Sequence, residues 1–396
     1  MIVTVTLNAA LHVAYTLLAP PSGGTIPPRP PLLMGGLPAP PYPPGPPVPV
    51  SRPGYRAGGR GVTVARVLRA FGHDVVAAGL AGGASGELII QDLAKSGVPT
   101  AFTLIRGESR RFFRFTSPDS GEPALRFSEP APYITTEELG RFAADYRRLL
   151  AGAAAVVLCG SLPDSLPADT YGSLVTYAAE AGVPVILDAG GEELKHAVGH
   201  GPDLVVAESS ATGPETGALD AAELGTALIR LGAAAAAVAV GGQVHAVTAD
   251  GKWTARLEAA DEDGADPYYP TARGALVAGL VPGQLLGWSW PDRLRHALAL
   301  AAGGAGSWTR EPGGPEDREA GEEGGERDRI DLAAYERLLD TVLVDPPARG
   351  HLKELLIDHS ECAKVGTRLI NSPPNLGPRQ FPDPKLEWSD REQMAN

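Results

Sequence analysis

The chain has 396 residues, with 34 basic and 47 acidic side chains and a formal net charge of −13. This length can bury one large core or two domains, and the charge argues against a general binder of nucleic acid or anionic membranes. Cys159 and Cys362 are too few for a disulfide framework. The chain shows no basic, apolar leader and no apolar run long enough to span a membrane. We therefore expect a cytoplasmic protein.

The order of apolar runs predicts the fold class. Continuously apolar strands that alternate with helices indicate a parallel sheet covered on both faces, which is an α/β fold. Two alternating segments near residue 120 predict a hairpin outside that sheet. In chain order, the predicted strands are 2–7, 75–80, 112–116, 124–127, 154–159, 183–188, 203–207 and 234–240. The predicted helices are 62–71, 86–96, 168–181, 221–231, one that begins at Gly274, 290–302 and 330–339.

Two inserts and a tail interrupt or follow this pattern. Residues 20–49 contain 14 prolines in 30 positions, a composition that no packed element tolerates. We predict a loop insert at about 19–50; a solvated loop is favoured over a proline-rich ligand for a protein partner. A second, acidic and glycine-rich insert spans about 311–329. Residues 346–396 are expected to form a largely irregular C-terminal extension.

The segment 270–275 carries the chemistry that the sequence suggests most directly. It reads Pro-Thr-Ala-Arg-Gly-Ala and precedes an Ala- and Gly-rich helix. Free N–H groups at a helix N-terminus favour phosphate and other anions. The Ala275 side chain at this turn has no group that could take up a proton.

The chain resembles the PfkB (ribokinase-like) carbohydrate kinases, nearest the 1-phosphofructokinase and tagatose-6-phosphate kinase branch. The resemblance implies a ribokinase-like three-layer α/β/α fold with a mainly parallel sheet and a small β-stranded lid, in a kinase domain at 1–345. It also implies ATP-dependent phosphorylation of a sugar phosphate with Mg²⁺. The segments that carry it are 6–11, 57–66, 79–83, 108–111, 127–130, 160–163, 187–188 and the turn at Pro270.

The resemblance assigns several residues to the substrate. His12 stands where the family has an Asp, and imidazole offers one acceptor instead of two oxygens. Arg60 replaces a Lys and can clasp a phosphate bidentately. Arg110 matches a position that contacts the substrate phosphate, with an exposed strand arginine as the alternative. The predicted substrate-binding residues are His12, Gly58, Gly59, Arg60, Thr63, Arg110 and Glu129.

The nucleotide half of the site departs further from the family pattern. Glu208 replaces an Asn that organises Mg²⁺ and phosphate; a carboxylate could serve a hard metal, but we assign no metal ligands. At the turn, Ala275 replaces the family's Asp, beside Arg273 and Gly274, so we expect impaired or lost catalysis. The predicted cofactor-binding residues are Glu208, Gly241, Thr271 and Gly274.

Three readings of the function remain open. The chain is a working sugar-phosphate kinase, a non-catalytic phosphosugar-binding or regulatory protein, or a scaffold recruited to other chemistry in a specialised pathway. The four departures at His12, Thr63, Glu208 and Ala275, together with the two inserts, favour an impaired or absent kinase activity. The expected partner is a phosphorylated sugar or a related small molecule, with neither nucleic acid nor membrane. Family members can form homodimers through the lid strands, which leaves a homodimer open here.

Overall fold

The computed structural model describes residues 1–18, 49–116, 123–209, 220–257, 270–304 and 332–345. Nearly all of the predicted insert at 19–50, the insert at 311–329 and the extension at 346–396 lie outside these ranges. The turn of the predicted hairpin, at 118–121, lies outside them as well.

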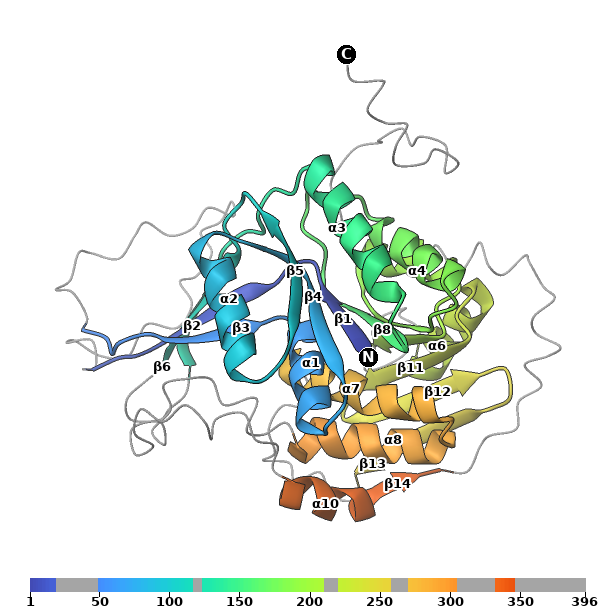
Figure 1. The fold of residues 1–396 in the computed structure, drawn as a ribbon. Helices are drawn as coiled ribbons and strands as arrows, with labels where there is room; N and C mark the ends of the chain where they lie inside the picture. Colours follow the sequence, from blue (N-terminus) through green and yellow to red (C-terminus); the bar gives the residue numbers. More distant parts are fainter. Residues whose placement is uncertain (19–48, 117–122, 210–219, 258–269, 305–331, 346–396) are drawn as a thin grey trace, which may run out of the picture.

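The described residues form a ten-stranded central sheet in the order β14-β13-β12-β11-β10-β9-β8-β1-β4-β5 (Figure 1). The strands from β5 to β11 run parallel, and β12, β13 and β14 are added antiparallel at one edge. The predicted mainly parallel α/β fold is therefore confirmed. The bounds are β1 Ile2–Thr6, β4 Val75–Gly82, β5 Thr100–Ile105, β8 Ala155–Cys159, β9 Val185–Asp188, β10 Leu204–Glu208, β11 Ala235–Val240, β12 Gln243–Thr248, β13 Lys252–Leu257 and β14 Val342–Val344.

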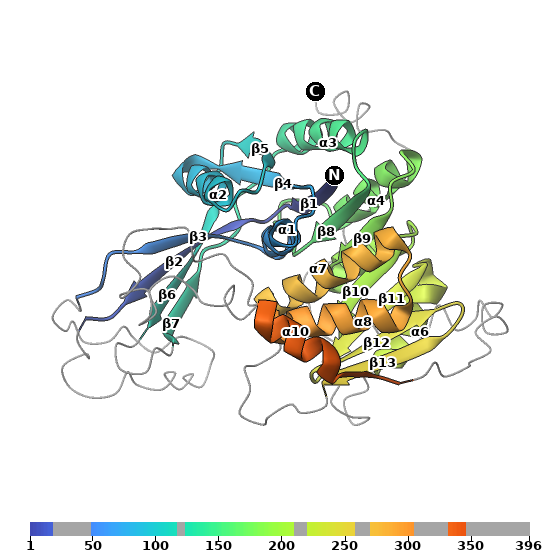
Figure 2. The same ribbon diagram turned by 60° about the horizontal axis from the view of Figure 1, so that its bottom comes forward.

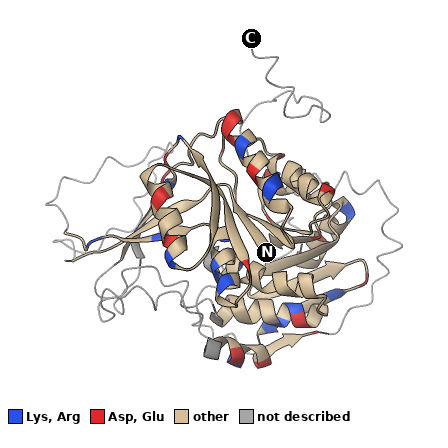
Figure 3. Cartoon of the chain, in the orientation of Figure 1, with Lys and Arg blue, Asp and Glu red and all other residues tan. Residues whose placement is uncertain are grey.

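A layer of helices covers each face of this sheet, and each layer packs on an apolar core of its own (Figure 2). The strands between them carry few charges, whereas the acidic and basic segments fall mostly on the helices (Figure 3). One layer comprises α1 Arg60–Ala70, α2 Gly83–Lys95, α7 Pro270–Leu286, α8 Trp290–Ala299 with the π-helix η2 Leu300–Gly304, and α10 Leu332–Thr341. The other comprises α3 Thr136–Leu150, α4 Thr170–Glu180, α5 Gly191–Val198 and α6 Ala221–Leu231.

The start of α1 is held close to the end of β1, and glycines make this approach feasible. Gly59 precedes the helix with a φ of 125°, in the region that favours glycine. A Cβ at Gly61 would lie 2.4 Å from Thr6 Oγ1. Any larger residue would push the helix start away from the strand, so the Gly-Gly-Arg-Gly sequence fixes where Arg60 enters the site.

A separate four-stranded sheet, the lid, projects from the main body in the order β3-β2-β6-β7. The predicted hairpin is confirmed as β6 and β7, which pair antiparallel; β2 and β3 were not predicted. Within the described ranges, every helix is too short or too polar to span a bilayer. The lid strands are β2 Ala10–Thr16, β3 Gly54–Gly58, β6 Arg110–Thr116 and β7 Pro123–Ser128.

Candidate functional site

The carboxyl ends of the parallel strands lie along one edge of the sheet, where the chain passes from β1 into lid strand β2. The chain continues from β1 to one side, where β4 lies, and later returns to the other side as β8. Open α/β sheets bind ligands at such a switch point. The Asn8 Nδ2 group, just after β1, donates to Ser161 Oγ, just after β8, at 3.4 Å. The fold therefore places a candidate ligand site at this edge.

An ionic cluster occupies the same edge. Asp188 ends β9 with a side chain that is 0% exposed, and its Oδ1 atom lies 3.1 Å from Arg60 Nη1. Arg273 donates to the same oxygen from Nε, at 2.8 Å, and reaches Glu208 Oε2, at the end of β10, with Nη1 at 2.8 Å. Two guanidinium groups and two carboxylates thus form a charge-balanced network that joins α1, α7, β9 and β10.

The start of α7 differs from the prediction. The helix begins at Pro270 and not at Gly274; Pro suits the first helical position because its φ is already helical and it lacks only an N–H that would have no partner. Because Pro270 has no N–H and the fourth helical N–H already bonds within the helix, the N–H groups without intrahelical partners in this first turn are those of residues 271 and 272, and that of Gly274 lies inside the helix. Thr271 belongs to this first turn, but its side chain is outside the described residues.

Gly274 and Ala275 face the protein interior. A Cβ at Gly274 would lie 2.8 Å from Thr63 Cβ, so α1 and α7 pack closely at their starts. The Ala275 side chain is 0% exposed and belongs to the apolar core beneath α7. Thr63 Oγ1 donates to the Gly59 carbonyl at 3.4 Å. These residues shape the site by packing.

The lid brings two predicted residues together over the start of α1. The His12 ring covers Gly58, because a Cβ at Gly58 would lie 2.2 Å from His12 Nε2. His12 also packs on the Phe112 ring, with centroids 5.2 Å apart. His12, Gly58 and Arg60 therefore follow one another along the lid's junction with the main body.

Arg110 and Glu129 lie differently on the lid. Arg110 Nη1 donates to Ser128 Oγ at 3.3 Å, and burial lowers the pKa of its guanidinium. Glu129 pairs with Arg111, whose Nη2 lies 2.7 Å from Glu129 Oε1, and this hydrogen bonding lowers the pKa of the Glu129 carboxyl. Because neighbouring residues on a strand point to opposite faces, Arg110 and the Arg111–Glu129 pair face opposite sides of the lid.

Gly241 lies in the two-residue turn between β11 and β12, two residues after Ala239, which pairs with Glu208 in the sheet. Gly241 and Gly242 have φ values of 51° and 76°, as a tight hairpin requires. A Cβ built at Gly241 meets no atom within 4 Å. The backbone at the carboxyl end of β11 is therefore open at Gly241, and the assignment of Gly241 to a cofactor stays a prediction.

Asp188 was not among the predicted site residues. A signal for it was available, because an Asp that ends an otherwise apolar strand, Val-Ile-Leu-Asp, must lie at the carboxyl edge of the sheet. Cys159 ends the neighbouring strand β8. Burial, and then the Asp188 carboxylate, raises the pKa of the Cys159 thiol well above its usual value. The thiol is therefore a packing group and not a nucleophile.

The site as it stands does not fit the Mg²⁺ ion that the family resemblance implies. Mg²⁺ binds oxygen ligands, chiefly carboxylates, in a near-octahedral shell. Here Asp188 Oδ1 and Glu208 Oε2 both accept from Arg273. Among the described residues, no group of three or more His, Cys, Asp or Glu side chains is arranged to hold a metal ion.

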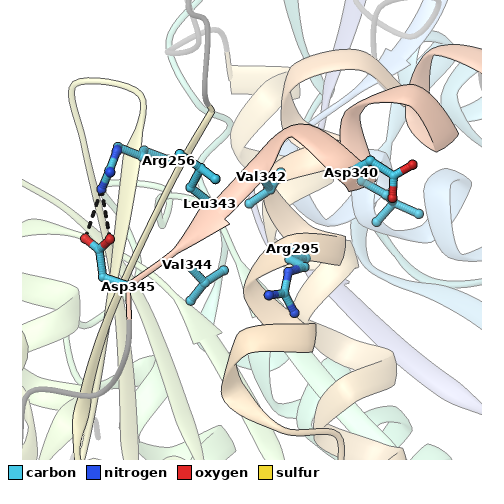
Figure 4. Close-up of a pocket in the computed structure, with 8 residues that line it drawn as sticks. Arg256, Arg295, Asp340, Val342, Leu343, Val344 and Asp345 are labelled. Carbon is cyan, nitrogen blue, oxygen red and sulfur yellow. Dashed lines mark hydrogen bonds and ion pairs between the residues drawn. The ribbon is translucent and has the colours of Figure 1, made fainter.

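A cavity of about 510 Å³ lies elsewhere, at the far edge of the sheet (Figure 4). Three strands separate β14, which lines it, from β10. Its ionic contact is the Arg256–Asp345 pair, with Nη1 and Oδ2 2.9 Å apart and both side chains exposed. None of the predicted site residues lines this cavity, so we do not assign the function to it.

Comparison with known proteins agrees with the geometry. A sequence profile described as pfkB family carbohydrate kinase matches residues 39–252, a range that ends before α7. A tagatose-6-phosphate kinase of Staphylococcus epidermidis is 35% identical over 146 residues, which are 37% of this chain and 46% of that protein. The chain thus spans about half the length of the curated relatives it matches.

Solved structures match over more of the chain. Phosphofructokinase-2 from Escherichia coli in complex with fructose-6-phosphate has a TM-score of 0.60 at 22% identity, covering 76% of this chain and 92% of that one. The tetrameric inhibited form of the same enzyme gives 0.63 at 21% identity, covering 85% and 98%. At this level of identity, the likeness establishes the shared fold.

Proposed function

Because this chain belongs to the pfkB family of carbohydrate kinases, we propose that it binds a hexose phosphate at the edge where β9, β10, α1 and α7 meet. The proposed phosphoryl donor is ATP, and transfer is impaired because Ala275 stands at the position of the family's Asp base. Arg60 and Arg110 are the proposed contacts of the sugar's phosphate. His12, which covers Gly58 at the lid junction, is the proposed partner of a sugar hydroxyl.

The observation that carries this proposal is that the described residues near the start of α7 include no carboxylate free of an arginine partner. Ala275 is fully buried and has no proton acceptor. Asp188 and Glu208, the carboxylates beside it in the fold, are both bound to guanidinium groups. Both carboxylates therefore already accept hydrogen bonds from arginine side chains. Loss of general-base catalysis costs about 10²–10⁴-fold in rate.

The test compares turnover in the natural chain, Ala275→Asp and Ala275→Asn. ATP consumption is measured with fructose 6-phosphate, fructose 1-phosphate and tagatose 6-phosphate as acceptors. We expect Ala275→Asp to exceed the natural chain by about 10²-fold or more, and Ala275→Asn, which has similar size but no base, to stay near the natural level. Circular dichroism of each variant checks that the carboxylate has not unfolded the buried turn.

Two results would contradict the proposal. Measurable turnover of the natural chain that equals or exceeds that of a well-folded Ala275→Asp variant would show that the reaction uses another base. The second result would come from calorimetry with the same sugar phosphates and ATP. If none of these ligands bound detectably, the chain would have no retained phosphate site.

A non-catalytic, phosphosugar-binding role is the second candidate, and the same observation at Ala275 supports it. Sugar-phosphate binding without turnover in both the natural chain and folded Ala275→Asp would favour it. The homodimer stays a prediction; the exposed apolar side chains that it would cover on the lid are Tyr55, Leu125 and Phe127. The cytoplasmic location also stays a prediction.

A further inference from the structure

Arg273 has an unusual set of partners for an arginine at a helix start. Its guanidinium reaches Asp188 Oδ1 with Nε at 2.8 Å and Nη2 at 2.7 Å. It reaches Glu208 Oε2 with Nη1 at 2.8 Å and the Val206 carbonyl with Nη2 at 3.2 Å. The side chain is only 14% exposed. Three oxygens from the ends of β9 and β10 therefore converge on one buried positive group.

These oxygens are the kind that a divalent cation selects, namely two carboxylates and a backbone carbonyl. A second observation points the same way. Asp188 Oδ2 is buried and accepts no hydrogen bond from the described residues, although the side chain is fully enclosed. A buried carboxylate oxygen without a donor is costly unless a cation lies close by. Here that nearby charge comes from the two guanidinium groups on Oδ1.

The charge balance leaves no place for a metal ion as well. Asp188 and Glu208 contribute two negative charges, and Arg60 and Arg273 contribute two positive charges. A divalent ion at the same oxygens would have to displace Arg273 and would otherwise be repelled at close range. The position of Arg273 is fixed by α7, whose next residue, Gly274, packs directly on α1.

We propose that the Arg273 guanidinium takes the place of the divalent cation in this site, so that the chain binds phosphorylated ligands without a metal ion. Arginine presents five N–H groups, and the contacts above account for four of them. The fifth, on Nη1 at the more exposed Glu208 side, has no acceptor among the described residues and can donate to a phosphate oxygen. A tethered cation cannot dissociate, so chelators would not empty the site. The inference deepens the proposed function, because it concerns the phosphate side of the same site.

The first test measures Mn²⁺ binding by electron paramagnetic resonance in the natural chain and in Arg273→Ala. We expect the natural chain to bind no Mn²⁺ at millimolar concentration. Arg273→Ala should gain a Mn²⁺ site whose Kd is at least tenfold below that concentration. Arg273→Lys, which keeps the charge, and Arg273→Ala/Glu208→Ala, which removes a ligand, should both lose the new site. Arg256→Ala is the matched control, because it frees the exposed Asp345 carboxylate far from the cluster.

The inference is wrong if the natural chain binds Mn²⁺ as tightly as Arg273→Ala, or if a folded Arg273→Ala gains no Mn²⁺ site. The natural chain provides an independent measure in case the variant does not fold. Calorimetry with fructose 6-phosphate should give the same Kd in EDTA and in Mg²⁺, and a tenfold weakening in EDTA would overturn the inference. Mn²⁺ binding does not depend on turnover, so brisk ATP consumption would refute the proposed function and leave this result standing.

Discussion

Removing the Asp188 carboxylate should destabilise the fold far more than removing an exposed one. Asp188 is 0% exposed and bound by Arg60, which is 21% exposed, and by Arg273. Breaking a buried ion pair by removing one partner costs about 3–5 kcal/mol. Because Arg273 keeps its contacts with Glu208 and Val206, and both arginines retain some hydration, we expect the lower end of this range, about 3 kcal/mol, for Asp188→Ala.

The assay is urea denaturation followed by tryptophan fluorescence, with Asp188→Asn and Asp345→Ala beside the main variant. Asp188→Asn keeps the shape and one acceptor oxygen, so its loss of unfolding free energy should fall between the other two. Asp345→Ala breaks the exposed pair with Arg256 and should cost about 0–1 kcal/mol. The m-value should stay constant across the series if only the folded state has changed. Equal costs for Asp188→Ala and Asp345→Ala would refute the reasoning, because burial would then not matter.

Two further predictions concern the layer that carries α7 and α8. Burial lowers the pKa of His296 to about 4 from its usual 6.5, and its Nδ1 is in hydrogen-bond contact with the Tyr335 hydroxyl. As the pH falls, His296 therefore takes up a proton in the unfolded state before it does so in the folded state. The unfolding free energy should fall by up to about 3 kcal/mol as the pH drops from 6.5 to 4. His296→Gln should flatten that slope in urea titrations, and an unchanged slope would contradict the assignment. Gly279→Ala would place a Cβ 2.5 Å from the Ala297 Cα and should lower the thermal midpoint, whereas Gly140→Ala, with no atom within 4 Å in the middle of α3, should raise it by the equivalent of about 1 kcal/mol. The same shift for both variants would argue against close packing of α7 on α8.

The sequence was sufficient to predict the strands that are buried on both faces of the sheet. The runs that became β8, β9, β10 and β11 are continuously apolar, and each was predicted within a few residues of its bounds. The short strand β3, with the sequence Gly-Tyr-Arg-Ala-Gly, has no apolar alternation and was missed, because pairing with β2 in the lid stabilises it. The two-residue Gly241-Gly242 turn is a recognised hairpin signal, and the strands β12 and β13 beyond it were overlooked.

The sequence pointed to Arg60, Glu208 and Arg273 in the site, but not to Asp188 and not to the pairing of these charges. Arg273 was placed at a helix start, where anions bind favourably, and the structure gives it two carboxylates of the chain itself. Asp188 and Glu208 are 85 and 65 residues away from it in the sequence, and no local pattern links such distant charges. The predicted helix start at Gly274 was wrong because glycine was taken as the boundary, although Pro270 is the better first residue.

The lid strands β2 and β3 hold the two ends of the proline-rich segment side by side. Leu17 and Val50 form an antiparallel bridge, and the Leu18 N–H donates to the Pro49 carbonyl at 2.9 Å. These contacts involve only the ends, and doubling the length of any flexible loop placed between them would add only about 0.6 kcal/mol to its closure free energy. This junction is therefore a tolerant grafting point, where evolution or an engineer can exchange the intervening peptide with little thermodynamic consequence for the kinase scaffold.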